Sequence, residues 1–141
     1  MFLSLILPAW HDIEEYRIVI KHDGEVAVMC DSKVLKHINN SIVNTATGLE
    51  NASVYKVMLF GSYARQDNTD ESDIDYMVIL DNSKEDIKAF KRQMLSATDK
   101  LSLDNDVVIS LLVRDKESFV SLQDKLPLYK NILREGIALY G

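Results

Sequence analysis

The sequence predicts an α+β protein in which a mixed β-sheet is flanked by helices and an N-terminal β-hairpin forms an extension. Short β-branched and aromatic runs alternate with longer segments whose apolar residues recur at helical spacing. The chain has 141 residues, of which 47% are hydrophobic and 27% are charged, as in an ordinary globular protein. We therefore expect the extension over residues 1–31 and one domain over residues 32–141.

The extension is predicted from two β-rich runs that flank Asp23-Gly24, a strong hairpin signal. A two-residue loop at this turn would pair Ile18 with Met29 and would make both faces of the hairpin apolar. Such a hairpin needs cover from the core or from a second subunit, which would make the protein a homodimer. A loosely attached arm, or residues upstream of a natural start at Met29, are the alternatives.

The regular pattern begins at Ser32, a residue type that caps helices. Apolar residues recur at helical spacing from there to Leu49. Residues 54–60 and 74–80 are almost continuous apolar runs, which predicts two buried strands. The polar stretch between them is expected to contain a short helical turn at residues 63–66.

The second half of the chain continues the alternation. Ser83 is expected to begin a helix, because Glu85 and Asp86 fall in its first turn, where carboxylates are favoured. The apolar stripe of this helix runs to Leu101, and a third strand is predicted over residues 106–113. Short helices and a final strand follow at residues 116–124, 127–135 and 137–140.

Charge and composition argue against several classes of function. With 22 acidic and 16 basic residues, the net charge of −6 disfavours nucleic acid and anionic membranes as partners. The single cysteine, Cys30, cannot form an internal disulfide, and the three histidines show no zinc-site spacing. The apolar residues 2–10 are interrupted by Pro8 and are too few to span a membrane. They also lack the flanks of a secretory signal, so we expect a cytoplasmic location.

Asp73 and Asp75 are the first candidate functional residues. They are two apart on a predicted strand, so their side chains leave the same face, with Cα atoms roughly 6–7 Å apart. Two carboxylates this close repel each other unless a cation lies between them. Mg²⁺ accepts such oxygens while it retains positions for water and phosphate. The same spacing at Asp104 and Asp106 shows that an isolated pair equally fits a solvated strand end, so context decides.

Gly61 and Ser62 supply that context, because they close the preceding strand. Glycine allows a close approach of the backbone, and a serine hydroxyl with the N–H groups of a turn suits a phosphate. Ten residues separate Ser62 from Asp73, which is enough to bring the two strands side by side. Asp106, at the start of the third strand, would complete the metal site and accept a proton from an attacking hydroxyl. Asp104 would lie on the same strand face and is the alternative.

The combination resembles the DNA polymerase β-like nucleotidyltransferase superfamily, whose signature is Gly-Ser, ten residues and Asp-x-Asp. The run GSYARQDNTDESDIDYMVIL resembles the small prokaryotic branch of this superfamily, the minimal nucleotidyltransferases. The later run NDVVIS resembles the strand that carries the family's third carboxylate. The ending YKNILREGIALYG resembles the family's usual ending. The resemblance covers about residues 32–141 and implies a polymerase β palm-like nucleotidyltransferase fold. The family commonly has glycine where Gln66 stands.

The activity implied by this resemblance is transfer of a nucleoside monophosphate, AMP from ATP, to a hydroxyl, with pyrophosphate as the leaving group. By position, Asp73 and Asp75 would hold Mg²⁺. Asp106 would help to bind a second metal ion and would orient or deprotonate the acceptor.

The nucleotide site implied by the resemblance lies at the turn after the first buried strand. Gly61 and Ser62 would hold the triphosphate. Arg65 would neutralise phosphate charge, although an exposed arginine on a polar turn is an equally good interpretation.

In the minimal branch, the resemblance implies a helical HEPN protein as partner, with the nucleotidyltransferase as an antitoxin that adenylylates a tyrosine of the toxin. One alternative is a small-molecule enzyme that modifies an aminoglycoside or lincosamide as a dimer. The other is a partner-binding module in which Gln66 has weakened turnover.

Overall fold

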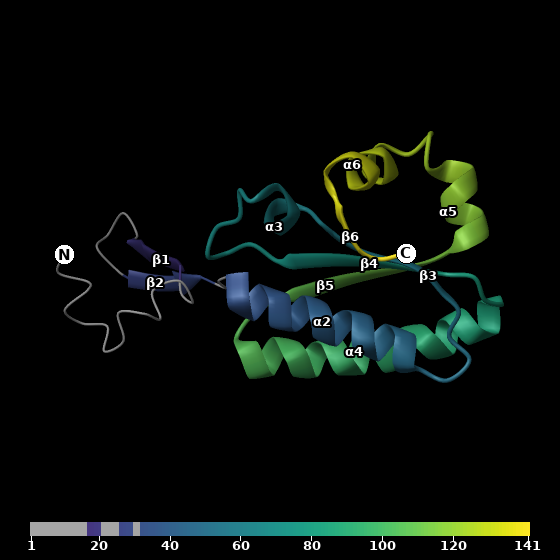
Figure 1. The fold of residues 1–141 in the computed structure, drawn as a ribbon, viewed down its shortest axis with the longest axis horizontal. Helices are drawn as coiled ribbons and strands as arrows, with labels where there is room; N and C mark the ends of the chain where they lie inside the picture. The colour runs from purple at the N-terminus through teal and green to yellow at the C-terminus, as the bar shows by residue number, and fades with distance from the viewer. Residues whose placement is uncertain (1–16, 21–25, 30–31) are drawn as a thin grey trace.

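A computed structural model describes the backbone of residues 17–20, 26–29 and 32–141, and the side chains of residues 32–141 (Figure 1). The order of elements agrees with the alternation expected from the sequence. The helices are α2 (Ser32–Gly48), α3 (Ser62–Arg65), α4 (Lys84–Asn105), α5 (Lys116–Leu122) and α6 (Pro127–Glu135). The strands are β1 (Arg17–Ile20), β2 (Val26–Met29), β3 (Val54–Phe60), β4 (Ile74–Leu80), β5 (Ile109–Asp115) and β6 (Ile137–Tyr140).

The central sheet has the strand order β5-β4-β3-β6. β3 is antiparallel to both β4 and β6, whereas β4 and β5 are parallel because the long helix α4 makes the crossover between them. The sheet is therefore mixed, as predicted. Its register places Phe60 opposite Asp75, so the end of β3 lies beside the beginning of β4.

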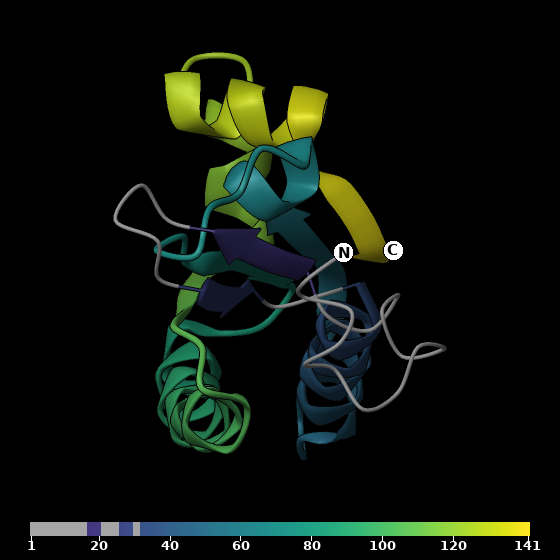
Figure 2. The same cartoon turned by 90° about the vertical axis from the view of Figure 1, so that its left-hand side faces the viewer.

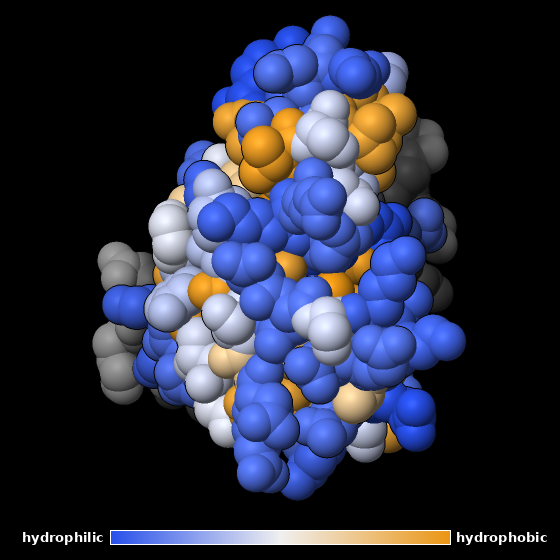
Figure 3. All heavy atoms as spheres, turned by 90° about the vertical axis from the view of Figure 1, so that its right-hand side faces the viewer, coloured by the Kyte–Doolittle hydropathy of each residue, from blue (hydrophilic) through white to orange (hydrophobic). Residues whose placement is uncertain are grey.

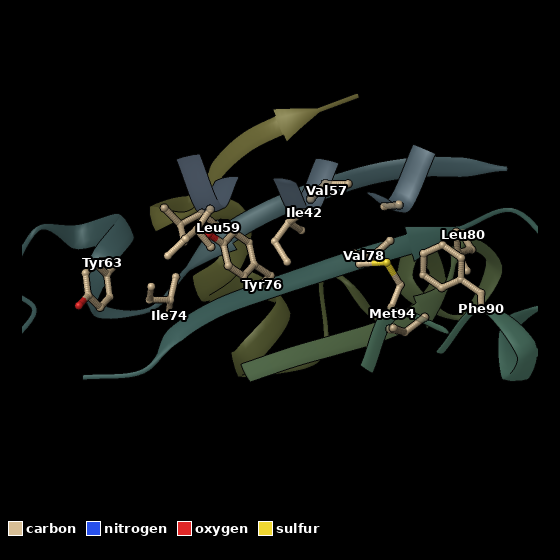
Figure 4. Close-up of a cluster of buried hydrophobic side chains, with 13 residues drawn as sticks. Ile42, Val57, Leu59, Tyr63, Ile74, Tyr76, Val78, Leu80, Phe90 and Met94 are labelled. Atoms are coloured by element: carbon tan, nitrogen blue, oxygen red, sulfur yellow. The ribbon is translucent and has the colours of Figure 1, made fainter. Parts of the chain in front are cut away.

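One face of the sheet is covered along its length by α2 and α4, which lie side by side beneath it (Figures 1 and 2). Alternate residues of β4 point into this layer and are fully buried, as expected from the period of two in a strand. Figure 4 shows Tyr76 between the strands and α2, close to Leu59 and Ile42. The Tyr76 hydroxyl donates a hydrogen bond to Asn39 Oδ1 at 2.5 Å, so its polar atom is satisfied. Each large side chain buried here stabilises the fold by about 1.5–3 kcal/mol.

The opposite face is covered by a smaller layer that α5 and α6 provide. Met77 of β4 packs here with Phe119 of α5 and with Tyr129 and Ile132 of α6. The rings of Phe119 and Tyr129 lie 4.9 Å apart between centroids, with a tilt of 40°. Asp75 precedes Met77 by two residues and is on the same side of the strand. The Asp75 side chain therefore lies on the less covered face of the sheet.

Capping residues close the start of α4, the start of α5 and the end of α6. Ser83 caps α4 by accepting the N–H of Asp86 at 3.3 Å. Asp115 caps α5 by accepting the N–H of Ser118 at 2.8 Å, an interaction that was not predicted. Gly136 is the C-cap of α6. These caps satisfy backbone groups that helix termini leave without intrahelical partners.

The start of the third strand was predicted wrongly. β5 begins at Ile109 rather than at residue 106, because α4 continues to Asn105. Asp106 is the C-cap of α4 in the left-handed conformation, with φ 51°, and its N–H bonds to the Ser102 carbonyl. Aspartate tolerates this conformation better than most residues, so it ends a helix where the apolar pattern alone predicts a strand. Asp104 consequently lies in the last turn of α4.

The N-terminal hairpin exists, but its expected register was wrong. β1 and β2 are antiparallel, with Ile18 opposite Val28 and Ile20 opposite Val26. Five residues separate the last pair, and a two-residue loop at Asp23-Gly24 would require a different pairing. The turn and the hairpin side chains lie outside the described residues. The division into an extension and a domain stays a prediction.

The surface seen in Figure 3 is mostly hydrophilic, and apolar side chains gather in its upper part, on the side where α5 and α6 lie. The exposed large apolar residues of these helices and their connection are Val120, Leu126, Leu128 and Leu133. Across the described residues, no helix combines the length and apolar character that a membrane crossing requires.

Replacing Asp115 by alanine should lower the free energy of unfolding by about 1 kcal/mol near pH 7, the usual contribution of an N-cap side chain. The hydrogen bond from Ser118 lowers the pKa of Asp115. Its contribution is therefore complete above the ordinary aspartate pKa and is lost as the pH falls through the lowered value. Urea unfolding at neutral and strongly acidic pH measures the difference. Asp124→Ala, an exposed position, is the control, and an equal loss at both pH values would contradict the cap.

Candidate active site

Gly61 ends β3 directly beside the carboxylate of Asp75. Its backbone has φ 74° and ψ −155°, a region that is open almost only to glycine. A Cβ atom at this position would collide with Oδ2 of Asp75. The glycine is therefore required both by its conformation and by the neighbour that it admits. The sequence predicted a close approach of this backbone to a ligand, and the structure adds that an acidic side chain lies against it.

Ser62 begins α3, a single turn that folds back over the end of β3. The N–H of Arg65 donates to the Gly61 carbonyl at 3.1 Å, and the N–H of Asp67 donates to the Ser62 carbonyl at 3.1 Å. Tyr63 is 7% exposed and lies near Ile74 in Figure 4, so the turn is attached to the main core. Ser62 thus lies at a fixed point between the strand end and the helical turn.

Gln66 is the C-cap of α3 in the left-handed conformation, with φ 64°. A side chain makes this conformation unfavourable, which gives a physical reason for the glycine that the family resemblance leads us to expect here. Gln66 is exposed and its N–H bonds to the Ser62 carbonyl, so the turn closes with glutamine at this position.

Asp73 and Asp75 form the acidic part of the site. Asp75 is partly buried, whereas Asp73 is exposed. Burial raises the pKa of Asp75, and the neighbouring negative charge of Asp73 raises it further. The positive charge of Arg65 acts in the opposite direction. A bound cation would relieve the same repulsion.

Arg65, at the end of α3, is paired with two other carboxylates. Its Nε is 3.1 Å from Oδ2 of Asp67, and its Nη1 is 3.4 Å from Oε2 of Glu135. The Arg65 side chain is 42% exposed, so its guanidinium is accessible to a ligand. Because its charge acts on the Asp75 carboxyl group, the predicted phosphate-neutralising residue lies near one of the predicted metal ligands.

The strand on the other side of β4 does not present a carboxylate to the pair. The register of the parallel strands places Ser110 beside Asp75, and the N–H of Ile74 donates to the Val108 carbonyl at 2.9 Å. Asp106 lies before the strand, at the end of α4, and is exposed. Within residues 17–20, 26–29 and 32–141, no three Asp, Glu, His or Cys side chains form a group that could hold a metal ion. Asp106 is thus not brought into one group with Asp73 and Asp75, and its catalytic role stays a prediction.

Two neighbours of the site were missed in the sequence. Ser110 is the one hydroxyl residue in an otherwise apolar stretch of β5, which is a weak signal that becomes informative only once the register is known. Glu135 is 70 positions from its partner Arg65, and no local pattern links them.

The donor set fits a hard divalent cation. Asp73 and Asp75 offer carboxylate oxygens, the ligands that Mg²⁺ prefers, and their mutual repulsion favours a cation between them. Gly61 contributes no side chain, so the backbone can approach a ligand beside Asp75. Chemically, the site combines an acidic pair, a serine turn and an accessible arginine, which suits a metal-bound polyphosphate.

Residues 40–141 match the sequence model of a family described as "Polymerase beta, Nucleotidyltransferase". The chain belongs to this nucleotidyltransferase family. Family membership confirms the predicted superfamily, the nucleotidyltransferase fold and the assignment of the chain as a transferase enzyme.

Two curated relatives come from Methanocaldococcus jannaschii. One, named "Putative protein adenylyltransferase MJ0604", is 32% identical over 112 residues, which are 79% of this chain and 100% of that protein. The other, named "Putative protein adenylyltransferase MJ0141", is 32% identical over 74 residues, which are 52% of this chain and 73% of that protein.

Solved structures with a similar fold include a chain from a crystal structure of a toxin-antitoxin with AMP-PNP. It has a TM-score of 0.47 and 21% identity, with 73% of each chain covered. A "putative nucleotidyltransferase from Sulfolobus solfataricus" has a TM-score of 0.45 and 23% identity, with 75% of this chain and 78% of that chain covered.

Gly61→Ala should lower the free energy of unfolding by about 2 kcal/mol or more, because it combines an unfavourable φ with a clash against Asp75. Gly48→Ala is the matched control, since a Cβ at Gly48 meets nothing within 4 Å. Alanine is also the better helix former, so this control should be neutral or stabilising. Urea unfolding of both variants measures the contrast, and similar effects at the two positions would contradict the described geometry.

Gln66→Gly should raise the free energy of unfolding by about 1 kcal/mol, because glycine removes the cost of a left-handed side chain. Gln66→Ala keeps a Cβ and is the control; it should not stabilise. Thermal unfolding measures both variants, and destabilisation by glycine would show that the Gln66 side chain itself contributes to the fold.

Proposed function

We propose that this chain transfers AMP from ATP to a hydroxyl group, with Mg²⁺ held by Asp73 and Asp75. The single observation that carries the proposal is the contact of the Gly61 backbone with the Asp75 carboxylate. That contact supports a single site formed by the Gly-Ser turn and Asp75, in a chain that belongs to a nucleotidyltransferase family. Two relatives with 32% identity carry names that specify a protein as the acceptor of the adenylyl group, which supports a protein acceptor here.

The acceptor that we propose is a tyrosine of a helical HEPN toxin, so that the chain acts as its antitoxin. This part rests on the resemblance of the run from Gly61 to Leu80 to the minimal nucleotidyltransferases. Asp73 is exposed and Arg65 is partly exposed. Because these side chains lie at the protein surface, a side chain of another protein could reach them, which supports a large acceptor.

The proposed reaction forms a bond from the acceptor oxygen to the α-phosphorus and breaks the bond from that phosphorus to the oxygen of the β-phosphate. Bound Mg²⁺ would supply charge stabilisation at the phosphate oxygens. Ser62 and the Gly61 backbone hold the triphosphate, and Arg65 balances the charge of departing pyrophosphate.

The hydroxyl proton requires an acceptor of its own. We assign it to Asp106, which lies where α4 ends and the chain approaches β5. In this role Asp106 would take the proton directly from the attacking hydroxyl, so it must come within hydrogen-bond reach of that oxygen in the substrate complex. A ligand role of Asp106 toward a second metal ion stays a prediction.

Asp73→Asn and Asp75→Asn should each lower transfer at least about 100-fold, because a lost metal ligand removes much of the electrostatic stabilisation. Both variants should fold normally and be slightly more stable without metal, since like-charge repulsion is removed. Asp99→Asn, an exposed position on α4, should transfer normally. The assay uses Mg²⁺ and ATP labelled at the α-phosphate, and normal transfer by either site variant would end the metal assignment.

The choice of acceptor in this assay separates the candidate functions. Label on the helical partner protein supports the proposal, and label on an added aminoglycoside or lincosamide instead supports the small-molecule enzyme. Tight binding of the partner without transfer to any acceptor indicates a binding module. Asp106→Asn tests the proton acceptor: transfer should fall while nucleotide binding is retained.

A further inference from the structure

A chain of charged side chains connects α3 to α6 above the end of β3. Arg65 is paired with two carboxylates, Asp67 on its own segment and Glu135 at the end of α6. The other carboxylate oxygen of Glu135, Oε1, is 3.1 Å from Nη2 of Arg134. Arg65 and Glu135 are far apart in the sequence, so their contact depends on how α6 packs against the sheet.

The position of Glu135 is determined by the residue that follows it. Gly136 donates its N–H to the Ile132 carbonyl at 2.8 Å, and an added Cβ would meet Met58 Cε at 3.1 Å and the Leu59 carbonyl at 3.2 Å. The end of α6 therefore packs directly against β3, just before the strand reaches the site glycine. Glu135 has a side chain only 31% exposed and is held where it reaches back to α3.

Attachment of α3 does not require this ion pair. The buried ring of Tyr63 and the backbone bonds around Gly61 already connect the turn to the core. A partly exposed ion pair contributes little to stability. Its larger effect is on the position of the guanidinium, which two carboxylates hold from different directions.

Without Glu135, Arg65 keeps its pair with Asp67, and the Nη1 end of its guanidinium becomes free to interact with Asp75. Arg65 is close enough to Asp75 to lower the pKa of that carboxyl group. An arginine that turned onto Asp75 would compete with a metal ion for the carboxylate and would no longer be available to a phosphate.

We propose that Glu135 is a positioning residue, which holds the Arg65 guanidinium at the edge of the acidic pair and directs it toward the phosphates of the bound nucleotide. The inference rests on the proposed function and deepens it, because it adds a residue from α6 to the nucleotide site.

The test measures binding of a non-hydrolysable ATP analogue with Mg²⁺ by calorimetry, so it does not depend on the acceptor. Glu135→Gln keeps the size of the side chain and removes its charge, and should weaken binding about fivefold, the scale of one partly exposed ion pair. Arg65→Gln should weaken binding by at least as much. The double variant should bind like Arg65→Gln alone, because Glu135 acts through Arg65.

Two controls separate positioning from structure. Glu117→Gln removes an exposed charge from the neighbouring helix α5 and should leave affinity unchanged. Arg134→Gln removes the second partner of Glu135 and should keep affinity or raise it. Thermal unfolding of Glu135→Gln should stay close to that of the original chain, and the affinity difference should shrink at high salt.

The outcomes are distinct. Unchanged affinity in Glu135→Gln overturns the inference and leaves the proposed function intact. A further loss in the double variant beyond Arg65→Gln, or a loss that follows a lowered unfolding temperature, also overturns it. Absence of any binding by the original chain overturns the inference and the proposed function together.

Discussion

The contact between the Gly61 backbone and the Asp75 carboxylate is the constraint on which the site depends. It exists because the antiparallel register of β3 and β4 places Phe60 opposite Asp75, so that Gly61, the residue after β3, meets the carboxylate. Only glycine permits both the positive φ and the close approach at this point. The same short segment therefore ends the strand, begins the serine turn and places an acidic group beside it.

The unequal cover of the two sheet faces explains why this acidic group remains accessible. α2 and α4 bury one face along its length, and Ile74 belongs to that core. On the other face, α5 and α6 cover Met77 and Ile79 but not the first residues of β4. Asp75 is thereby partly buried, and burial together with Asp73 raises its pKa. A pair of mutually repelling carboxylates, one of them partly buried, is a good ligand for a divalent cation.

Much of the fold could be predicted because apolar runs with clear ends define their elements. β3 and β4 begin and end where their apolar runs do, and α6 begins at its proline. The start of β5 could not be predicted, since Asp106 adopts a left-handed conformation that propensity does not reveal. The hairpin register failed for a similar reason: the turn signal at Asp23-Gly24 does not determine how many residues the loop contains.

Some residues of the candidate site could likewise be predicted from the sequence, and others could not. Spacing along the chain was enough to single out the Gly-Ser turn and the acidic pair, because both lie at strand ends that pair directly. Ser110 and Glu135 enter the site only through the parallel register of β5 and through the seat of α6 on β3, which are tertiary contacts. Asp106 is the opposite case: the sequence singled it out as a third carboxylate, but the fold does not bring it into one group with Asp73 and Asp75.

The most direct test of this account is a crystal structure of the chain with Mg²⁺ and a non-hydrolysable ATP analogue. The account predicts a metal ion about 2.0–2.2 Å from oxygens of both Asp73 and Asp75. It also predicts that the triphosphate lies against the Gly61-Ser62 turn. A nucleotide bound elsewhere, or a metal ion that contacts neither aspartate, would contradict it.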